Sequence, residues 1–149
     1  LNVPGRFNFF NYRDATLIAD YGHNPDAIQA LVRAVDAIPS QRRCVVISGA
    51  GDRRDEDIRQ QTEILGEAFD EVILYQDQCQ RGRADGEVLK LLRQGLNQAG
   101  RARVIDEIRG EFLAIDQALS RLKPGDLCLI LIDQIDEALA HITRRVAEG

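Results

Sequence analysis

Polar and charged residues follow two apolar runs of this sequence, at the points where strand-like segments give way to helix-like ones. The segment 20–26 (DYGHNPD) follows the apolar run 16–19, and the segment 51–57 (GDRRDED) follows the apolar run 44–47. In an open α/β sheet, the carboxyl ends of the strands and the amino ends of the helices face one crevice, which is where ligands bind. We therefore expect both segments to be site loops.

The first segment combines helix-capping residues with residues that can do chemistry. Asn24 is a good helix N-cap, and Pro25 suits the first helical position, where its missing N–H leaves no donor unsatisfied. Asp20 ends an apolar run, where a carboxylate commonly accepts a hydrogen bond from a sugar hydroxyl. His23 lies near predicted helix amides that attract anions, so it could donate to a phosphate or assist a magnesium site. Local structural roles for Asp20 and His23 remain the alternative.

The second segment contains glycines followed by charged residues. Gly49 and Gly51 allow a sharp turn and the close approach of a ligand, although the sequence is neither a GxGxxG nor a GxxxxGK[ST] motif. Considered alone, the segment predicts a solvated, mutually paired helix start formed by Asp52, Arg53, Arg54 and Asp55. Asp55, Glu56 and Asp57 would be favourable to the helix dipole.

Five apolar runs alternate with five segments of helical periodicity, which is the pattern of βαβ units. The predicted strands cover residues 16–20, 44–48, 71–75, 103–106 and 126–132. Continuously apolar strands belong in a parallel sheet covered by helices, and a hairpin of residues 7–10 with 16–19 adds one antiparallel strand. The predicted fold is a Rossmann-like α/β three-layer sandwich. Its six-stranded sheet is mostly parallel, with one antiparallel strand at the N-terminal edge.

Length, composition and charge restrict the class of protein. The chain has 149 residues, of which 44% are apolar and 29% charged, and this predicts one domain with a single core. No apolar run approaches the about 20 residues of a membrane span, and no signal peptide is evident, so we expect a cytoplasmic protein. The net charge of −5 argues against nucleic-acid binding. Because the chain lacks an initiator Met, we expect it to be part of a longer protein.

The cysteines and the second histidine are predicted to be structural. The three cysteines lack CxxC spacing; Cys44 and Cys128 lie in predicted strands and are expected in the core, whereas Cys79 lies in a predicted loop. We expect no metal site built by this chain, and we expect His141 to be an exposed helix residue.

Four motifs, in their order, resemble the C-terminal domain of the Mur ligase family, most closely that of cyanophycin synthetases. They are the PGRF start at 4–7, the DYGHNP loop at 20–25, the GDRRDED loop at 51–57 and the Arg81-Gly82-Arg83 turn. The resemblance spans nearly the whole chain. It implies one such domain over residues 1–149 of a longer ATP-dependent ligase, with a central P-loop domain as its partner.

The resemblance also implies roles for individual residues. Arg6 would lie beside the ATP phosphates and Asp20 beside the ribose, and His23 and Asn24 would complete the nucleotide-facing set. Arg6 and His23 are the predicted catalytic residues. The cofactors would be ATP and Mg²⁺, with the magnesium ligands mainly in the central domain, so the isolated domain is expected to be inactive. The amino-acid side would comprise Gly51, Asp52, Arg53, Asp55, Arg81 and Arg83.

One departure from the family pattern bears on the substrate. Residues 76–80 carry a single carboxylate, whereas cyanophycin synthetases have a strongly acidic stretch there. If those acids recognise a cationic amino acid, this chain is expected to take a different amino acid. Two alternatives remain open: a stand-alone nucleotide- or anion-binding regulatory module, and a dinucleotide oxidoreductase, against which the missing GxGxxG motif argues. A homo-oligomer is also compatible with the sequence.

Overall fold

A single six-stranded sheet forms the centre of the molecule. The structure is a computed structural model that describes residues 3–49, 53–76 and 83–149. The sheet has the order β1-β2-β6-β3-β4-β5, in which β1 pairs with β2 antiparallel and every other pair is parallel. The strands are β1 (Asn8–Tyr12), β2 (Ala15–Asp20), β3 (Arg43–Ile47), β4 (Glu71–Gln76), β5 (Val104–Arg109) and β6 (Leu127–Leu131). The predicted fold class is confirmed.

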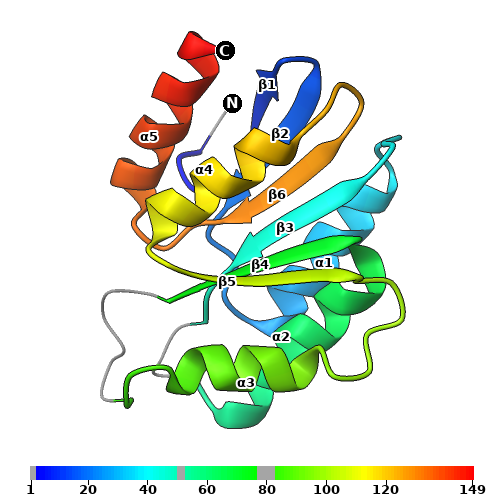
Figure 1. Cartoon of the computed structure of the whole chain (residues 1–149), viewed down its shortest axis with the longest axis vertical. Coiled ribbons are helices and arrows are strands. Elements are labelled where there is room, and N and C mark those ends of the chain that lie inside the picture. Colours follow the sequence, from blue (N-terminus) through cyan, green and yellow to red (C-terminus); the bar gives the residue numbers. More distant parts are fainter. Residues whose placement is uncertain (1–2, 50–52, 77–82) are drawn as a thin grey trace.

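Helices cover both faces of this sheet, as Figure 1 shows. The helices are α1 (Pro25–Asp36), α2 (Asp55–Ala68), α3 (Glu87–Gly95), α4 (Glu111–Arg121) and α5 (Ile135–Glu148). One hydrophobic cluster joins the sheet to α1, α2 and α3, and a second joins it to α4 and α5, so the sheet divides the expected single core into two. None of the helices in the described ranges is long and apolar enough to cross a membrane.

Local sequence explains the main features of the sheet. All five residues of β6 are buried, as expected for the apolar run at 126–132 that now lies between two strands. The hairpin of β1 and β2 turns at Arg13 and Asp14, which both have positive φ, 52° and 67°. Two consecutive positive φ values match the right-handed twist of the flanking strands. Cys44 and Cys128 are buried in the core, as predicted, and the register of β3 and β6 sets them directly opposite each other.

Two sequence-based expectations need correction. The fourth parallel strand runs to Arg109 and not to residue 106, because β5 is an edge strand that tolerates the charged residues Asp106, Glu107 and Arg109. His141 is not an exposed helix residue. Its side chain is 12% exposed, stacks on the Phe112 ring at 4.9 Å and places Nε2 2.7 Å from an Asp116 oxygen. The packing of α5 on α4 buries it.

Candidate functional site

The PGRF turn at residues 4–7 is fastened to the loop that follows β2. The Tyr21 amide donates to the Gly5 carbonyl at 2.8 Å, and the Phe7 amide donates to Asp20 Oδ2 at 2.8 Å. Gly5 and Phe7 both have positive φ, 81° and 45°, and this conformation is uncommon for a bulky residue such as Phe7. Backbone strain of this kind persists where the surroundings enforce it and is concentrated at functional sites. The two motifs therefore form one unit at the carboxyl end of β2.

Asp20 holds this unit together. Oδ1 accepts the Gly22 amide at 2.7 Å while Oδ2 accepts the Phe7 amide, and the residue is 8% exposed. A substituent on Gly22 would approach Asp20 Oδ1 to 3.2 Å, so the loop closes tightly around the carboxylate. Asp20 therefore has the local structural role that the sequence left open as an alternative. A contact with a nucleotide ribose remains a prediction and would use the remaining lone pairs of the same oxygens.

His23 and Asn24 connect the loop to α1. Asn24 is the N-cap, since its Oδ1 accepts the Ala27 amide at 2.8 Å, and Pro25 follows at the first helical position. The predicted capping roles are confirmed. His23 is 6% exposed, its ring packs against Tyr21 with centroids 4.3 Å apart, and its Nδ1 lies 2.5 Å from the Tyr21 carbonyl oxygen. Because a carbonyl oxygen only accepts, Nδ1 is the donor, and the imidazole lies within the loop.

Arg6 is the cation of this unit that remains exposed. Its backbone amide donates to the Val3 carbonyl at 2.9 Å, and its guanidinium forms no ion pair within the part of the chain that the structure describes. An exposed guanidinium without an ion pair is suited to bind phosphate oxygens, for which its planar donors fit well. The predicted nucleotide-facing residues Arg6, Asp20, His23 and Asn24 therefore lie together at one sheet edge.

Residues of the predicted amino-acid side meet after β3 and β4. Arg83 Nη1 lies 2.8 Å from Asp55 Oδ1 at the start of α2, and Nη2 donates to the Arg53 carbonyl at 2.7 Å. Arg83 also pairs with Glu87 in the first turn of α3. Burial lowers the pKa of Arg83, but hydrogen bonds with these two carboxylates outweigh it, so the net pKa is raised. Gly51, Asp52 and Arg81, like Cys79, lie outside the described residues.

The acidic start of α2 is only partly paired within itself. Arg54 binds Asp57 at 3.1 Å and Glu56 at 3.0 Å, whereas Asp55 is bound to Arg83 from the segment that precedes α3. The predicted mutually paired helix start is therefore present for Arg54, and Asp55 instead joins α2 to the neighbouring loop. No group of three or more metal-ligating side chains occurs in residues 3–49, 53–76 and 83–149.

Sequence reasoning missed two buried polar residues at the same sheet edge. Glu111 is 6% exposed and accepts the Asp133 amide at 2.7 Å and the Gln134 amide at 3.2 Å, which fixes the chain before α5. Gln61 is fully buried on α2 and donates to the His23 carbonyl. A signal for Gln61 was present, because it stands between Ile58 and Leu65 at a spacing that an apolar residue normally occupies.

Comparisons with known proteins identify relatives of this chain. Residues 5–131 match the family described as Mur ligase, glutamate ligase domain. The chain is 35% identical over 143 residues to cyanophycin synthetase of Crocosphaera subtropica, covering 96% of this chain and 16% of that protein. It is 28% identical to a UDP-N-acetylmuramoyl-L-alanyl-D-glutamate--2,6-diaminopimelate ligase of Aquifex aeolicus, covering 88% of this chain and 26% of that protein.

Solved structures share the fold. A UDP-N-acetylmuramoyl-L-alanyl-D-glutamate--2,6-diaminopimelate ligase has a TM-score of 0.81 at 19% identity, and covers 99% of this chain and 32% of its own. Escherichia coli FolC in complex with ADP has a TM-score of 0.75 at 22% identity, and covers 99% of this chain and 33% of its own. The chain therefore spans a third or less of the length of these relatives and structures.

Proposed function

Because this chain belongs to the Mur ligase family, as a glutamate ligase domain, we propose that it closes over ATP and an amino acid in a longer ligase. That ligase joins an acid to an amino acid. The observation that carries the proposal is the fastening of the PGRF turn to the Asp20–Asn24 loop at the amino end of α1. This fastening brings an exposed guanidinium, a carboxylate and a helix start to one sheet edge, a combination that suits a nucleotide with its phosphates.

The proposed reaction has two steps. The acid's carboxylate oxygen attacks the γ-phosphorus of ATP, which gives an acyl phosphate and releases ADP. The amine of the amino acid then attacks the acyl carbon and loses a proton to solvent, an amide forms, and inorganic phosphate leaves with the electrons of the broken C–O bond. Negative charge develops on the transferring phosphoryl group, and Arg6 is the side chain of this domain that we assign to stabilise it.

Asp20, His23 and Asn24 are assigned to hold the nucleotide end of the site. Asp20 keeps the PGRF turn and the loop in one conformation. We assign its remaining lone pairs to the nucleotide ribose. Mg²⁺ would neutralise phosphate charge when bound, with its ligands mainly in the central domain of the parent chain. The paired Asp55 and Arg83 would lie on the amino-acid side.

The experiment uses the full-length ligase with substitutions in this domain. Arg6→Ala should lower kcat by about a hundredfold or more, because the guanidinium acts on charge that develops in the transition state. Asp20→Asn should mainly raise KM for ATP, since a ribose contact is made equally in the ground and transition states. It should also destabilise the domain by about 1–2 kcal/mol, because one of two amides loses its charged acceptor. Steady-state kinetics and thermal melting measure both effects.

The matched control is Arg33→Ala, which removes an exposed arginine from the last turn of α1. It should leave kcat and KM unchanged. Wild-type turnover in Arg6→Ala would overturn the assignment to the phosphates. Titration calorimetry of the 149-residue chain tests the alternative of a stand-alone module: we expect ATP affinity in the millimolar range or weaker, roughly as for half a site. Micromolar binding would favour the regulatory module.

A further inference from the structure

Gln61 links the loop after β2 to α2 through the interior of the domain. It lies on α2, is 0% exposed, and its Nε2 is 3.4 Å from the carbonyl oxygen of His23. The two residues are 38 positions apart in the sequence, so this contact ties the loop after β2 to α2, which begins at Asp55. Gln61 thus contacts the nucleotide-facing loop from the interior of the domain.

The oxygen of the Gln61 side-chain amide has no hydrogen-bond donor in the described part of the chain. Its Oε1 is buried and has no hydrogen-bond partner among the described residues. A buried acceptor without a donor costs free energy that an apolar side chain of similar size would avoid. The helical stripe that contains Ile58 and Leu65 would accommodate such an apolar residue. The presence of an amide at this position is therefore unfavourable for the fold alone.

The next residue shows what a purely structural polar group does in the same setting. Thr62 is equally buried, and its Oγ1 donates to the Leu92 carbonyl on α3 at 2.6 Å. Its hydroxyl joins two helices of the core and does not reach the site loops. Gln61 and Thr62 thus form a matched pair on one helix, of which one contacts the nucleotide-facing loop and the other a scaffold helix.

We propose that Gln61 is a positioning residue that holds the His23 segment in the conformation that binds the nucleotide, at some expense of fold stability. This inference rests on the proposed function. If the loop must be ordered before it binds, the apparent affinity falls in proportion to the fraction of molecules whose loop is already ordered. Loss of the Gln61 contact lowers that fraction, so it weakens nucleotide binding without altering the chemical step.

The first test compares Gln61→Met and Thr62→Val in the full-length ligase. Gln61→Met should raise KM for ATP by about tenfold with kcat within about twofold of wild type, because only the ordered fraction changes. Its melting temperature should be unchanged or higher, since the substitution removes an unsatisfied buried oxygen. Thr62→Val should do the reverse: the melting temperature falls and KM for ATP stays at the wild-type value. A Gln61→Met enzyme with a lower melting temperature and a wild-type KM would overturn the proposal.

The second test does not depend on catalysis. In the 149-residue chain, Gln61→Met should speed amide hydrogen exchange at Gly22 and Ala27 by about tenfold relative to amides of β3, because local opening becomes easier. These two amides donate within the loop, to Asp20 and Asn24. Thr62→Val should leave the ratio unchanged. Unchanged exchange in Gln61→Met would overturn the proposal, whereas a wild-type ligase that consumes no ATP would overturn the proposed function and leave the exchange result valid.

Discussion

The carboxyl group of Asp85 is held in its charged form by two neighbours. Arg109, at the end of β5, donates to it at 2.9 and 3.0 Å, and Gln76, at the end of β4, donates to it at 2.6 Å. The hydrogen bonds from Arg109 and then from Gln76 lower the pKa of Asp85 to about 2. The segment that precedes α3 is therefore anchored to the ends of two strands, close to the Arg83–Asp55 pair of the site.

This pKa gives a prediction for acid. A carboxyl group whose pKa is lower in the folded state adds stability above its unfolded pKa of about 3.9, and loses it as pH falls through the folded value. The Asp85 anchor should therefore be intact above about pH 4 and be lost toward pH 2. An NMR titration of the Asp85 carboxyl carbon should give a midpoint near 2 in wild type. Arg109→Met should move it upward.

The matched control is Arg103→Met, which removes another exposed arginine next to the start of the same strand. It should leave the Asp85 midpoint unchanged. An Asp85 midpoint that stays near 2 in Arg109→Met would show that the arginine does not set the pKa. Because both partners are solvent-exposed, the global stability is expected to change little in either variant.

Single residues were predictable from the sequence where their roles are local. The N-cap Asn24 and the first-turn Pro25 follow from two adjacent positions, and both are confirmed. The Asp85–Arg109 pair was not predictable, because it depends on the register that places β5 beside β4 and on a strand that runs to Arg109. Asp20 was recognised as a site residue, but its two amide donors come from separate segments that only the folded chain brings together.

At the scale of elements, α2 and α3 approach closely because of one glycine. A methyl group at Gly95 would come within 2.1 Å of the Arg59 carbonyl oxygen and of Thr62 Oγ1. The first of these atoms belongs to the backbone of α2, so it cannot move aside without displacing the helix. This close approach places Thr62 where its hydroxyl reaches the Leu92 carbonyl of α3. Gly95 therefore sets how closely α2 and α3 pack.

The predicted effect of Gly95→Ala is a large loss of stability. The new methyl group must force the two helices apart, and such overpacking costs about 1–3 kcal/mol or more. Gly86→Ala is the matched control: a methyl group there meets nothing within 4 Å, but φ is +80°. That variant should lose only about 1 kcal/mol, the usual penalty for a left-handed residue with a side chain. Urea unfolding measures both; equal losses would contradict the steric explanation.

Helical periodicity identified the five helices of the described residues, because each buries one apolar stripe against the sheet. It did not reveal how closely two helices approach, which depends on small residues opposite each other in space. The periodicity of the sequence also did not predict the order of the strands in the sheet. The last strand, β6, lies between β2 and β3. The apolar residues 127–131 do not indicate which two strands pair with β6.

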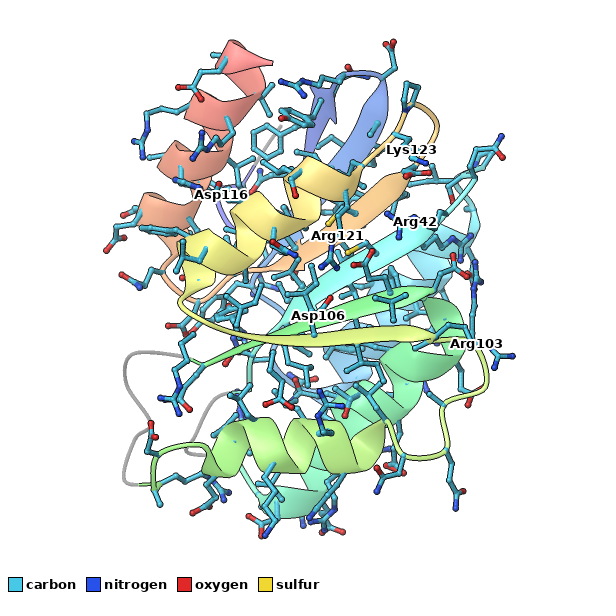
Figure 2. The ribbon with its side chains drawn as sticks, viewed as in Figure 1. Arg42, Arg103, Asp106, Asp116, Arg121 and Lys123 are labelled. Atoms are coloured by element: carbon cyan, nitrogen blue, oxygen red, sulfur yellow. The ribbon has the colours of Figure 1, made fainter. Side chains whose placement is uncertain are left out.

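At the scale of the whole molecule, the carboxyl ends and the amino ends of the strands form two edges of the sheet with different roles. The carboxyl edge carries the loops of the site, and the amino edge is closed by ion pairs around Glu71, which is 1% exposed. Arg42 binds Glu71 at 2.5 Å, and Arg121 binds both Glu71 and Asp106. These charged residues join β4, β5 and α4 to the segment before β3 (Figure 2).

This separation predicts that stability and activity can be changed independently. Glu71→Gln should destabilise the domain by about 3 kcal/mol, because it leaves two partly buried arginines without their shared carboxylate. In the full-length ligase, the folded fraction of this variant should keep the wild-type KM for ATP. Arg6→Ala should change turnover and leave stability within about 0.5 kcal/mol, as is usual for an exposed residue.

The double variant Arg6→Ala with Glu71→Gln decides whether the two edges are independent. Substitutions at distant sites without shared partners usually add within about 0.5 kcal/mol. The loss of unfolding free energy in the double variant should therefore equal that of Glu71→Gln, and its turnover per folded molecule should equal that of Arg6→Ala. Lys123→Gln, at the same amino edge but without an ion pair in the described part of the chain, is the control and should change neither quantity. A turnover that falls with Glu71→Gln alone would show that the rigidity of the sheet, and not only its carboxyl-edge loops, sets the geometry in which the phosphoryl group is transferred.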